Sequence, residues 1–370
     1  MSTSELDQLR DAVRDFLAAR SAEKHVRAAV ESDLGYDPGV YAQMAEQLGL
    51  QGLAIPAEHG GDGFGAQELA VVFEELGRAL TPGPFFATIA LGASALIASG
   101  DAAAQARYLP GIVAGTTTAT VALAESDGVW STDALQTRAC IAEDGWTIRG
   151  EKWFVVDGAG ADIVLVVAAT DDGPSLFAAE GSATGLDRAE MRTLDFTRRL
   201  AHLTFAETPA TLVGEAGDAD RIIAEVVLHA TAALAAEQVG GARACLEAAT
   251  AYARDRVQFG RQIGSFQAIK HKCADIFVRV QLAAAAATEA AGALDGATDS
   301  ETPELATAVA HAVCSEAFMF AAAENIQVHG GIGFTWEHPA HLYFRRAKSS
   351  QLLFGGPAMY YARVLTAAGV

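Results

Sequence analysis

The chain reads Arg256-Val-Gln-Phe-Gly-Arg-Gln-Ile-Gly-Ser-Phe-Gln267 between two long, Ala-rich segments with the periodicity of helices. The glycines predict a turn that joins these helices, so that Arg256 lies at the end of one and Gln267 at the start of the next. Both side chains can then point at one anionic group, because arginine offers a planar, charged fork that suits a pyrophosphate and a helix N-terminus adds unpaired N–H donors. A helical hairpin with a solvated arginine explains the same residues equally well.

A second glycine-rich stretch, Gln327-Val-His-Gly-Gly-Ile-Gly-Phe334, follows a long helical pattern. Its glycines let a backbone pass close to another molecule. A helix C-terminus followed by a loop accounts for it as well, and no strand precedes it as a dinucleotide-binding fingerprint requires. Alone, this stretch is weak evidence for a binding site.

The two stretches lie in a region that is helical from Gly217 almost to the end of the chain. Three segments are long enough for an antiparallel bundle with short connections, namely Ala219 to Val257, Ser265 to Leu294 and Glu301 to His329. We therefore predict a C-terminal four-helix-bundle domain over residues 216–370.

The pattern before this bundle changes near Thr116. From there to Val213 apolar residues alternate with period two, in short runs such as Ile163 to Val167 that Gly, Asp and Pro clusters separate. No helical pattern of about 10 to 15 residues intervenes, which argues against a Rossmann-type sheet. Residues 118–215 are thus predicted to form an antiparallel barrel or sandwich.

Residues 1–117 are again helical in pattern. Apolar residues recur at helical spacing from Glu68 to Leu80, a further helix runs through Leu91 to Ala98, and Asp101 is a typical cap of the next. The predicted fold class is α+β, with an N-terminal helical domain, a middle antiparallel β domain and a C-terminal helical bundle.

The composition excludes several classes of protein. With 51% hydrophobic and 19% charged residues the chain is not disordered, and a net charge of −20 argues against nucleic acid or an anionic membrane surface as a partner. Residues 1–20 favour an amphipathic helix over a signal peptide. Apolar runs such as Ala283 to Ala287 fall short of the roughly 20 residues of a spanning helix. We expect a cytoplasmic protein without membrane insertion.

The cysteines stand alone in the sequence, with no Cys-x-x-Cys and no histidine at metal-binding spacing. They are Cys140, Cys245, Cys273 and Cys314. We expect buried free thiols in a reducing cytoplasm, and no metal.

Taken together, the pattern RxxFGxxIxxFQ and the later QxxGGxGF resemble the acyl-CoA dehydrogenase family, and the resemblance extends over essentially the whole chain. Further segments similar to family motifs are Gly49-Leu50 through Pro56, Glu58-His59-Gly60-Gly61, Ala122-Leu-Ala-Glu-Ser126, Gly150-Glu151-Lys152 and Arg345-Arg346-Ala347-Lys348. The helix, β, helix layout of the family agrees with the order read from the patterns.

The resemblance implies an FAD at a subunit interface and the α,β-desaturation of an acyl-CoA thioester. In the family a glutamate takes the α-proton, the flavin takes the β-hydride, and an electron-transfer flavoprotein accepts the electrons. The flavin ring lies against the β domain of one subunit, and the bundle of its neighbour holds the adenosine and pyrophosphate. Carried over by motif, those neighbour contacts are Arg256, Phe259, Gln267, Gln327, Gly330 and Gly331.

The flavin-ring half of the family's site is not retained. Hydroxyl side chains that meet the flavin in the family fall on Ala124, Trp130 and Val156, and the neighbouring tryptophan position falls on Phe154. Hydrogen bonds to the polar edge of the flavin would be lost.

The family's base is also absent. Its glutamate falls on Phe354, or, in members that place it on the first bundle helix, on Ala230. Glu237 is seven residues further on, which is about 10 Å along a helix and beyond the reach of about 3 Å that proton abstraction needs. We therefore predict Glu237 to be a helix-surface or interface carboxylate, and no catalytic residue is assigned.

Other polar residues have structural interpretations. We expect His329 to pack beside the glycine loop and Glu125 to serve a structural role at a strand end. Arg345 and Arg346 are predicted to meet the phosphates of CoA or to form salt bridges across an interface.

Three functions remain open from the sequence. The first is a heteromeric α2β2 dehydrogenase with one FAD per pair, as in family members that act on CoA esters of bulky acids such as steroid side chains, where a paralogous partner supplies the base. The second is a self-sufficient homo-oligomeric dehydrogenase with an unidentified base. The third is a flavin-free scaffold or binding subunit.

Overall fold

The computed structural model describes residues 1–143, 145–297, 302–367 and 369. Its N-terminal part is helical, as predicted, and Asp101 caps a helix by accepting hydrogen bonds from the N–H groups of Ala103 and Ala104, both at 3.0 Å. The predicted helix from Leu91 to Ala98 is part of a longer run that begins as a π-helix, η3. The elements are α1 (Thr3–Arg20), α2 (Glu23–Glu31), α3 (Pro38–Leu48), η1 (Leu50–Gly52), η2 (Ala57–His59), α4 (Ala66–Arg78), η3 (Phe86–Ala93), α5 (Ser94–Ser99) and α6 (Ala102–Val113).

The middle part is a sheet that closes on itself. Its strands are β1 (Ala119–Ala122), β2 (Arg138–Ala142), β3 (Gly145–Val156), β4 (Ile163–Thr170), β5 (Gly173–Glu180), β6 (Leu186–Glu190) and β7 (Leu200–Val213). The order β1-β4-β2-β3-β7-β5 is completed by pairing between β4 and β5, so that β4, β2, β3, β7 and β5 form a ring. The prediction of an antiparallel domain is wrong for two pairings, because β4 lies parallel to both β1 and β2. Long intervening segments return the chain in the same direction, as parallel pairing requires.

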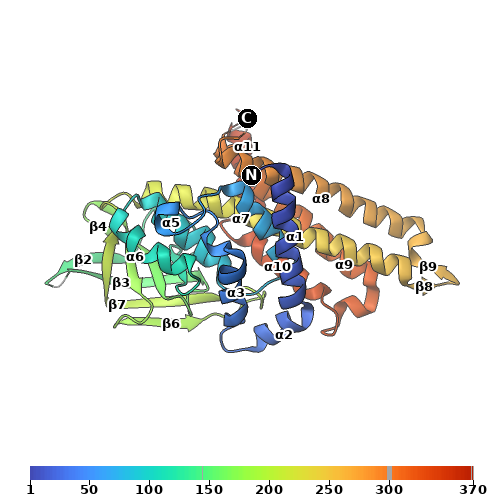
Figure 1. Ribbon diagram of the computed structural model, residues 1–370, viewed down its shortest axis with the longest axis horizontal. Coiled ribbons are helices and arrows are strands. Elements are labelled where there is room, and N and C mark those ends of the chain that lie inside the picture. Colours follow the sequence, from blue (N-terminus) through green and yellow to red (C-terminus); the bar gives the residue numbers. More distant parts are fainter. Residues whose placement is uncertain (144, 298–301, 368, 370) are drawn as a thin grey trace.

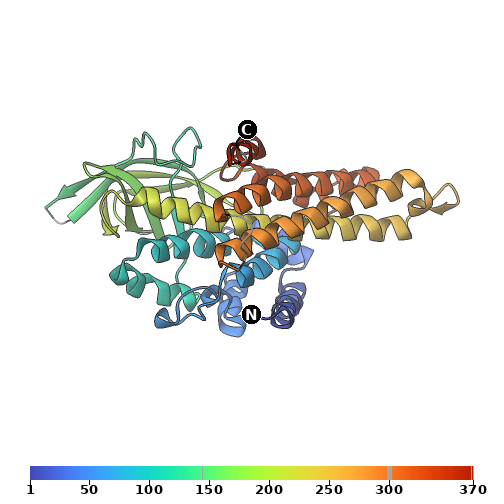
Figure 2. The ribbon, with the colours of Figure 1, turned by 90° about the horizontal axis from the view of Figure 1, so that it is seen from above.

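The C-terminal part is the predicted helical bundle. It contains α7 (Ala219–Asp255), β8 (Val257–Gln258), β9 (Arg261–Gln262), η4 (Ile263–Ser265), α8 (Gln267–Leu294), α9 (Pro303–His329), η5 (Gly330–Phe334), α10 (Ala340–Leu352) and α11 (Pro357–Ala367). Glu301, the predicted start of the third segment, lies outside the described residues. The sheet lies at one end of the molecule and the β8–β9 hairpin at the other, with α7 running between them (Figure 1). Seen from above, α7, α8 and α9 extend side by side away from the sheet (Figure 2).

Helices α4 and α7 cross at backbone contact distance because glycines occupy the crossing. A Cβ added at Gly240 would lie 1.8 Å from the carbonyl oxygen of Glu74, and one at Gly77 would lie 2.0 Å from that of Glu237. Only a residue without a side chain fits such an approach. This crossing fixes the N-terminal helices against the bundle and sets the position of Glu237.

Two predictions about buried and apolar segments need correction. Cys245 and Cys314 are buried, but Cys140 is exposed on β2 and Cys273 is half-buried on α8, since each lies on an outward-facing position of its element. Two helical segments, Ala219–Asp255 and Pro303–Phe334, are also long and apolar enough to span a membrane. Their most apolar windows are 72% and 67% buried in the protein, as expected for core helices, which pass the same test.

Candidate active site and cofactor site

The β8–β9 hairpin at the far end of the bundle presents an aromatic side chain to solvent. Its two central residues, Phe259 and Gly260, have φ values of 53° and 75°, as a type I′ turn requires. A positive φ is uncommon for phenylalanine, and this side chain is 91% exposed. The turn therefore holds an apolar ring away from the protein, where a partner or ligand can cover it.

Arg256 and Gln267 flank this hairpin. Arg256 ends α7, and its guanidinium is exposed with no hydrogen bond or ion pair to any described residue. Gln267 begins α8, a 28-residue helix whose first turn has no side-chain cap. The free N–H groups and the dipole of that helix start add to the charge of Arg256, so this corner suits an anion such as a pyrophosphate.

The glycine loop lies beside the end of α7 that leads into the hairpin. Helix α9 ends at His329, whose ring lies 4.3 Å from that of Tyr252 near the end of α7. Gly330 has a φ of 66°, and a Cβ added at Gly330 or Gly331 would meet nothing within 4 Å, so the space above the loop is open. His329 is buried and its Nδ1–H donates to the carbonyl oxygen of Asn325 at 2.8 Å, which agrees with the predicted packing role.

The structure thus brings the sequence-predicted cofactor residues to one exposed end of the bundle. They are Arg256, Phe259, Gln267, Gln327, Gly330 and Gly331. A cation, free N–H donors, an exposed aromatic ring and an open glycine loop fit the adenosine pyrophosphate portion of FAD.

The positions that meet the flavin ring in the family are apolar and filled in this chain. Ala124 and Val156 are buried and offer no hydrogen-bonding side chain. The ring of Trp130 lies edge-on to that of Phe354 with 4.6 Å between centroids, and Phe354 stacks on Phe86 at 6.2 Å. These side chains do not fit the polar edge of a flavin.

Both positions of the family's base lie within this apolar region. Phe354 is 3% exposed and Ala230 is fully buried, and both belong to one hydrophobic cluster. Ala230 and Arg256 are separated by 26 residues of helix α7, or about 39 Å at 1.5 Å per residue. The two half-sites of this chain are therefore too far apart to hold one cofactor.

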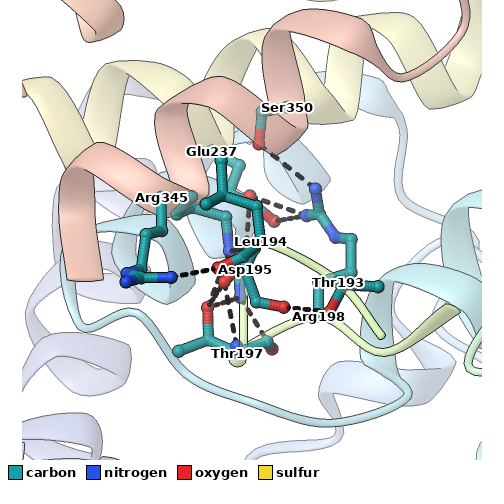
Figure 3. A network of polar contacts seen from close by, with 9 residues as sticks. Thr193, Leu194, Asp195, Thr197, Arg198, Glu237, Arg345 and Ser350 are labelled. Atoms are coloured by element: carbon teal, nitrogen blue, oxygen red, sulfur yellow. Dashed lines mark hydrogen bonds and ion pairs between the residues drawn. The ribbon is translucent and has the colours of Figure 1, made fainter. Parts of the chain in front are cut away.

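Glu237 is not the surface or interface carboxylate that the sequence predicted. It is 4% exposed and accepts hydrogen bonds from Nη2 of Arg198 at 2.7 and 2.6 Å and from Nη1 of Arg346 at 2.9 Å. Figure 3 shows Glu237 of α7 and Ser350 of α10 pointing toward Arg198. Burial opposes its ionisation, but the two guanidinium groups outweigh burial and hold the pKa of Glu237 below its ordinary value. It is therefore a poor proton acceptor.

Arg346, one of the two adjacent arginines, also differs in role from the prediction. Arg346 forms its ion pairs within the chain, with Asp195 and Glu237, both at 2.9 Å. Arg345 donates to the carbonyl oxygen of Leu194 at 3.0 Å, and its guanidinium lies 5.0 Å from the ring centroid of Trp336. Arg346 is thus committed to a buried network and is not available to CoA phosphates or to another subunit.

Glu125 has the structural role that the sequence predicted. It accepts hydrogen bonds from the N–H groups of Gln136 and Thr137, both at 2.9 Å, and from Nζ of Lys152 at 3.0 Å. Burial lowers the pKa of Lys152 to about 8, and the sequence did not identify this buried cation. In the described parts of the chain, no group of three His, Cys, Asp or Glu residues is arranged to hold a metal ion.

Asp157 is expected to make the stability of the fold depend on pH. Burial raises its pKa to about 7 against the opposing charges of Arg198 and Arg346. An acid whose folded pKa exceeds its unfolded value of about 4 destabilises the fold as pH rises from about 4 to 7. We expect Asp157→Asn to stabilise the protein by about 1 to 2 kcal/mol at pH 8 and not below pH 4. Asparagine also tolerates the φ of 51° at this position.

Urea denaturation at several pH values measures this effect. Asp187→Asn, at an exposed position of β6, is the matched control and should leave the pH profile unchanged. If the free energy of unfolding changes with pH in the same way for Asp157→Asn and for the unaltered protein, the pKa of Asp157 is not raised.

Comparison with known proteins agrees with this architecture. Family models for the N-terminal, middle and C-terminal domains of acyl-CoA dehydrogenases match residues 3–116, 120–207 and 221–366. The chain is 37% identical over 362 residues to the acyl-CoA dehydrogenase IpdE2 of Mycolicibacterium smegmatis, with 96% of each chain covered.

Solved structures give the same result. A variant of the Tcur3481-Tcur3483 steroid ACAD superposes with a TM-score of 0.87 at 32% identity, covering 99% of this chain and 98% of the other. The ChsE4-ChsE5 complex of Mycobacterium tuberculosis superposes with a TM-score of 0.89 at 27% identity, covering 100% and 98%. With all three domains matched, the chain belongs to the acyl-CoA dehydrogenase family of FAD-dependent oxidoreductases.

Proposed function

We propose that this chain is one subunit of a heteromeric acyl-CoA dehydrogenase that introduces an α,β double bond into an acyl-CoA thioester. It contributes the adenosine and pyrophosphate half of an FAD site at the subunit interface. A paralogous partner supplies the contacts to the flavin ring and the base. The observation that carries the proposal is that both positions of the family's base, Phe354 and Ala230, are buried in one apolar cluster, whereas the corner at Arg256 is open.

The residues of the open corner have separate tasks in this proposal. Arg256 and the start of α8 at Gln267 bind the pyrophosphate, and Phe259 covers the adenosine. Gly330 and Gly331 let the α9 loop approach the cofactor closely, with Gln327 beside them. Bound FAD supplies the hydride acceptor of the reaction, and the chain's own part is to hold and orient it.

The same proposal includes a partner subunit and a substrate class. Two of the similar structures are named as pairs of different chains, Tcur3481-Tcur3483 and ChsE4-ChsE5, and the first is named a steroid ACAD. We expect a heterotetramer with a paralogous subunit, a bulky acyl-CoA in the partner's site, an electron-transfer flavoprotein as acceptor and a cytoplasmic location.

The test is the amount of FAD bound per chain. The chain is purified alone and together with its co-expressed paralogue, and flavin absorbance is compared with protein concentration. The proposal requires little flavin in the lone chain and about one FAD per pair. One FAD per subunit in the lone chain, with desaturation activity, would favour a homo-oligomeric enzyme. A pair without flavin would favour a scaffold.

Arg256 gives a residue-level prediction for the pair. Arg256→Ala should raise the dissociation constant for FAD about tenfold to a hundredfold, because a charge-assisted hydrogen bond contributes about 1.5–3 kcal/mol. Arg254→Ala removes a second exposed arginine two residues away and serves as control, with an expected change below about twofold. Fluorescence titration of the FAD-free pair with FAD measures the dissociation constants of both variants. An equal loss of FAD affinity in the two would count against a specific role for Arg256.

A further inference from the structure

Three histidines gather near the end of α7, where α9 passes into α10. His329 ends α9, His338 lies in the turn before α10, and His341 lies in the first turn of α10. The ring centroid of His329 lies 4.3 Å from that of His338 and 4.3 Å from that of Tyr252 on α7. His329 and His338 bracket the glycine loop, residues 330–337, so their contact fixes both of its ends.

His338 also supports the start of α10. Its Nδ1 accepts a hydrogen bond at 3.2 Å from the N–H group of Ala340, the first residue of the helix. A ring nitrogen accepts a hydrogen bond only while it carries no proton, so this bond requires the neutral form of His338. Ala340 is 1% exposed, so its N–H group would be left unpaired inside the protein if the ring took up a proton. The closed loop therefore favours a neutral ring.

The surroundings of His338 oppose a positive charge on it. Burial lowers the pKa of His338, and the charge of His329 on α9 lowers it further. His341 on α10 and Arg27 on α2 act in the same direction, whereas Glu23 on α2 acts against them. The positive end of the α10 dipole adds to the opposition, because His338 lies beside the N-terminus of that helix. The ring therefore takes up a proton less readily here than it would in an open loop.

His341 resists protonation in the same way. Both of its ring nitrogens are shielded from water, and its ring lies edge-on to that of Trp336 in the loop, with 4.8 Å between centroids. Burial lowers the pKa of His341, and the backbone of Trp336 acts against this shift. The charges of Arg345 and Arg27 lower the pKa further, whereas Glu23 raises it. Two histidines in contact with the loop thus favour their neutral forms while it is closed.

We propose that His338 and His341 form a clasp that holds residues 330–340 closed at neutral pH and releases them in acid. In the open form each histidine has an ordinary pKa of about 6.5, so that form takes up protons preferentially as pH falls from about 7 to 5. The closed form loses stability over the same range. The clasp is a property of the chain without flavin. Acid should also weaken the binding of FAD to the pair, a consequence that rests on the proposed function.

Hydrogen exchange of the flavin-free full chain at pH 7.5 and pH 5.0 tests the clasp independently of the cofactor site. After correction for the intrinsic effect of pH on exchange, the protection of residues 330–342 should fall at least about tenfold at pH 5.0, because the open form binds at least one more proton. Residues 232–242 of α7 should keep their protection. Unchanged protection of the loop, or an equal loss in both segments, would overturn the clasp.

A substitution separates the charge of His338 from its hydrogen bond. In His338→Asn the side-chain oxygen accepts from the N–H group of Ala340 in place of Nδ1, and the side chain cannot take up a proton. Loop protection in this variant should fall about threefold or less at pH 5.0, which is the part left to His341. His271→Asn removes an exposed histidine on α8 and is the matched control, which should respond like the unaltered chain. A full tenfold fall in His338→Asn would overturn the role of this histidine.

Discussion

Replacement of Glu237 by glutamine is expected to lower the free energy of unfolding by about 3 to 5 kcal/mol. The carboxylate is 4% exposed and is the shared partner of Arg198 and Arg346, which come from the loop before β7 and from α10. Without its charge, the two buried guanidinium groups lose the carboxylate that both of them contact. The loss of one partner in a buried ion network costs far more than the network itself contributes.

Urea denaturation measures this loss, and a surface pair provides the control. Glu247 pairs with Arg78 but is half exposed, at 54%, so Glu247→Gln should cost no more than about 1 kcal/mol. Similar losses in the two variants would mean that Glu237 is effectively solvated and that the network does not join α7, α10 and the β domain. The variant should retain FAD in the pair, because Glu237 is about 28 Å from Arg256 along α7.

A carboxylate placed at the family's base position is not expected to create activity. Phe354→Glu should destabilise the chain by about 4 kcal/mol or more, since burial of a phenylalanine contributes about 3–5 kcal/mol and a buried unpaired carboxylate adds a desolvation cost. Phe86 and Trp130 fill the space on two sides of Phe354, which is itself 3% exposed. The new carboxyl group would have an elevated pKa and no path to a substrate.

Denaturation and acyl-CoA-dependent dye reduction together test this second prediction. Phe354→Leu keeps an apolar side chain at the same backbone φ of 63° and should cost less than about 2 kcal/mol, which separates packing from charge. A Phe354→Glu variant that folds stably and desaturates an acyl-CoA would show that this chain retains a usable active site, and the heteromeric proposal would fail.

Much of the fold follows from local patterns in the sequence. The periods of apolar residues predicted the helical, β and helical regions, and the glycine turn after Arg256 predicted the corner between α7 and α8. These features depend on neighbours in sequence, which is why they could be predicted. The parallel pairings of β4 with β1 and β2 join strands that are distant in sequence. Side chains alternate in the same way in parallel and antiparallel strands, so the pattern of the sequence does not distinguish the two.

The burial of Glu237 could not be predicted in the same way. Its partners Arg198 and Arg346 lie 39 and 109 residues away in sequence, and no local spacing connects them. One signal was present, because Glu237 is the only charged residue in the otherwise apolar and small stretch between Ala232 and Gly241. A lone carboxylate in such a run indicates a buried ion pair rather than a surface position.

The exposed turn of the β8–β9 hairpin determines how flavin loading of the proposed heteromer should respond to dilution. The backbone of the β8–β9 turn holds Phe259 in solvent without help from a second chain, so the folded subunit presents this ring to a partner. In the proposed heteromer, FAD is held only where two chains meet. Flavin loading at low protein concentration should accordingly follow the law of mass action for two chains, and dilution alone should release the cofactor.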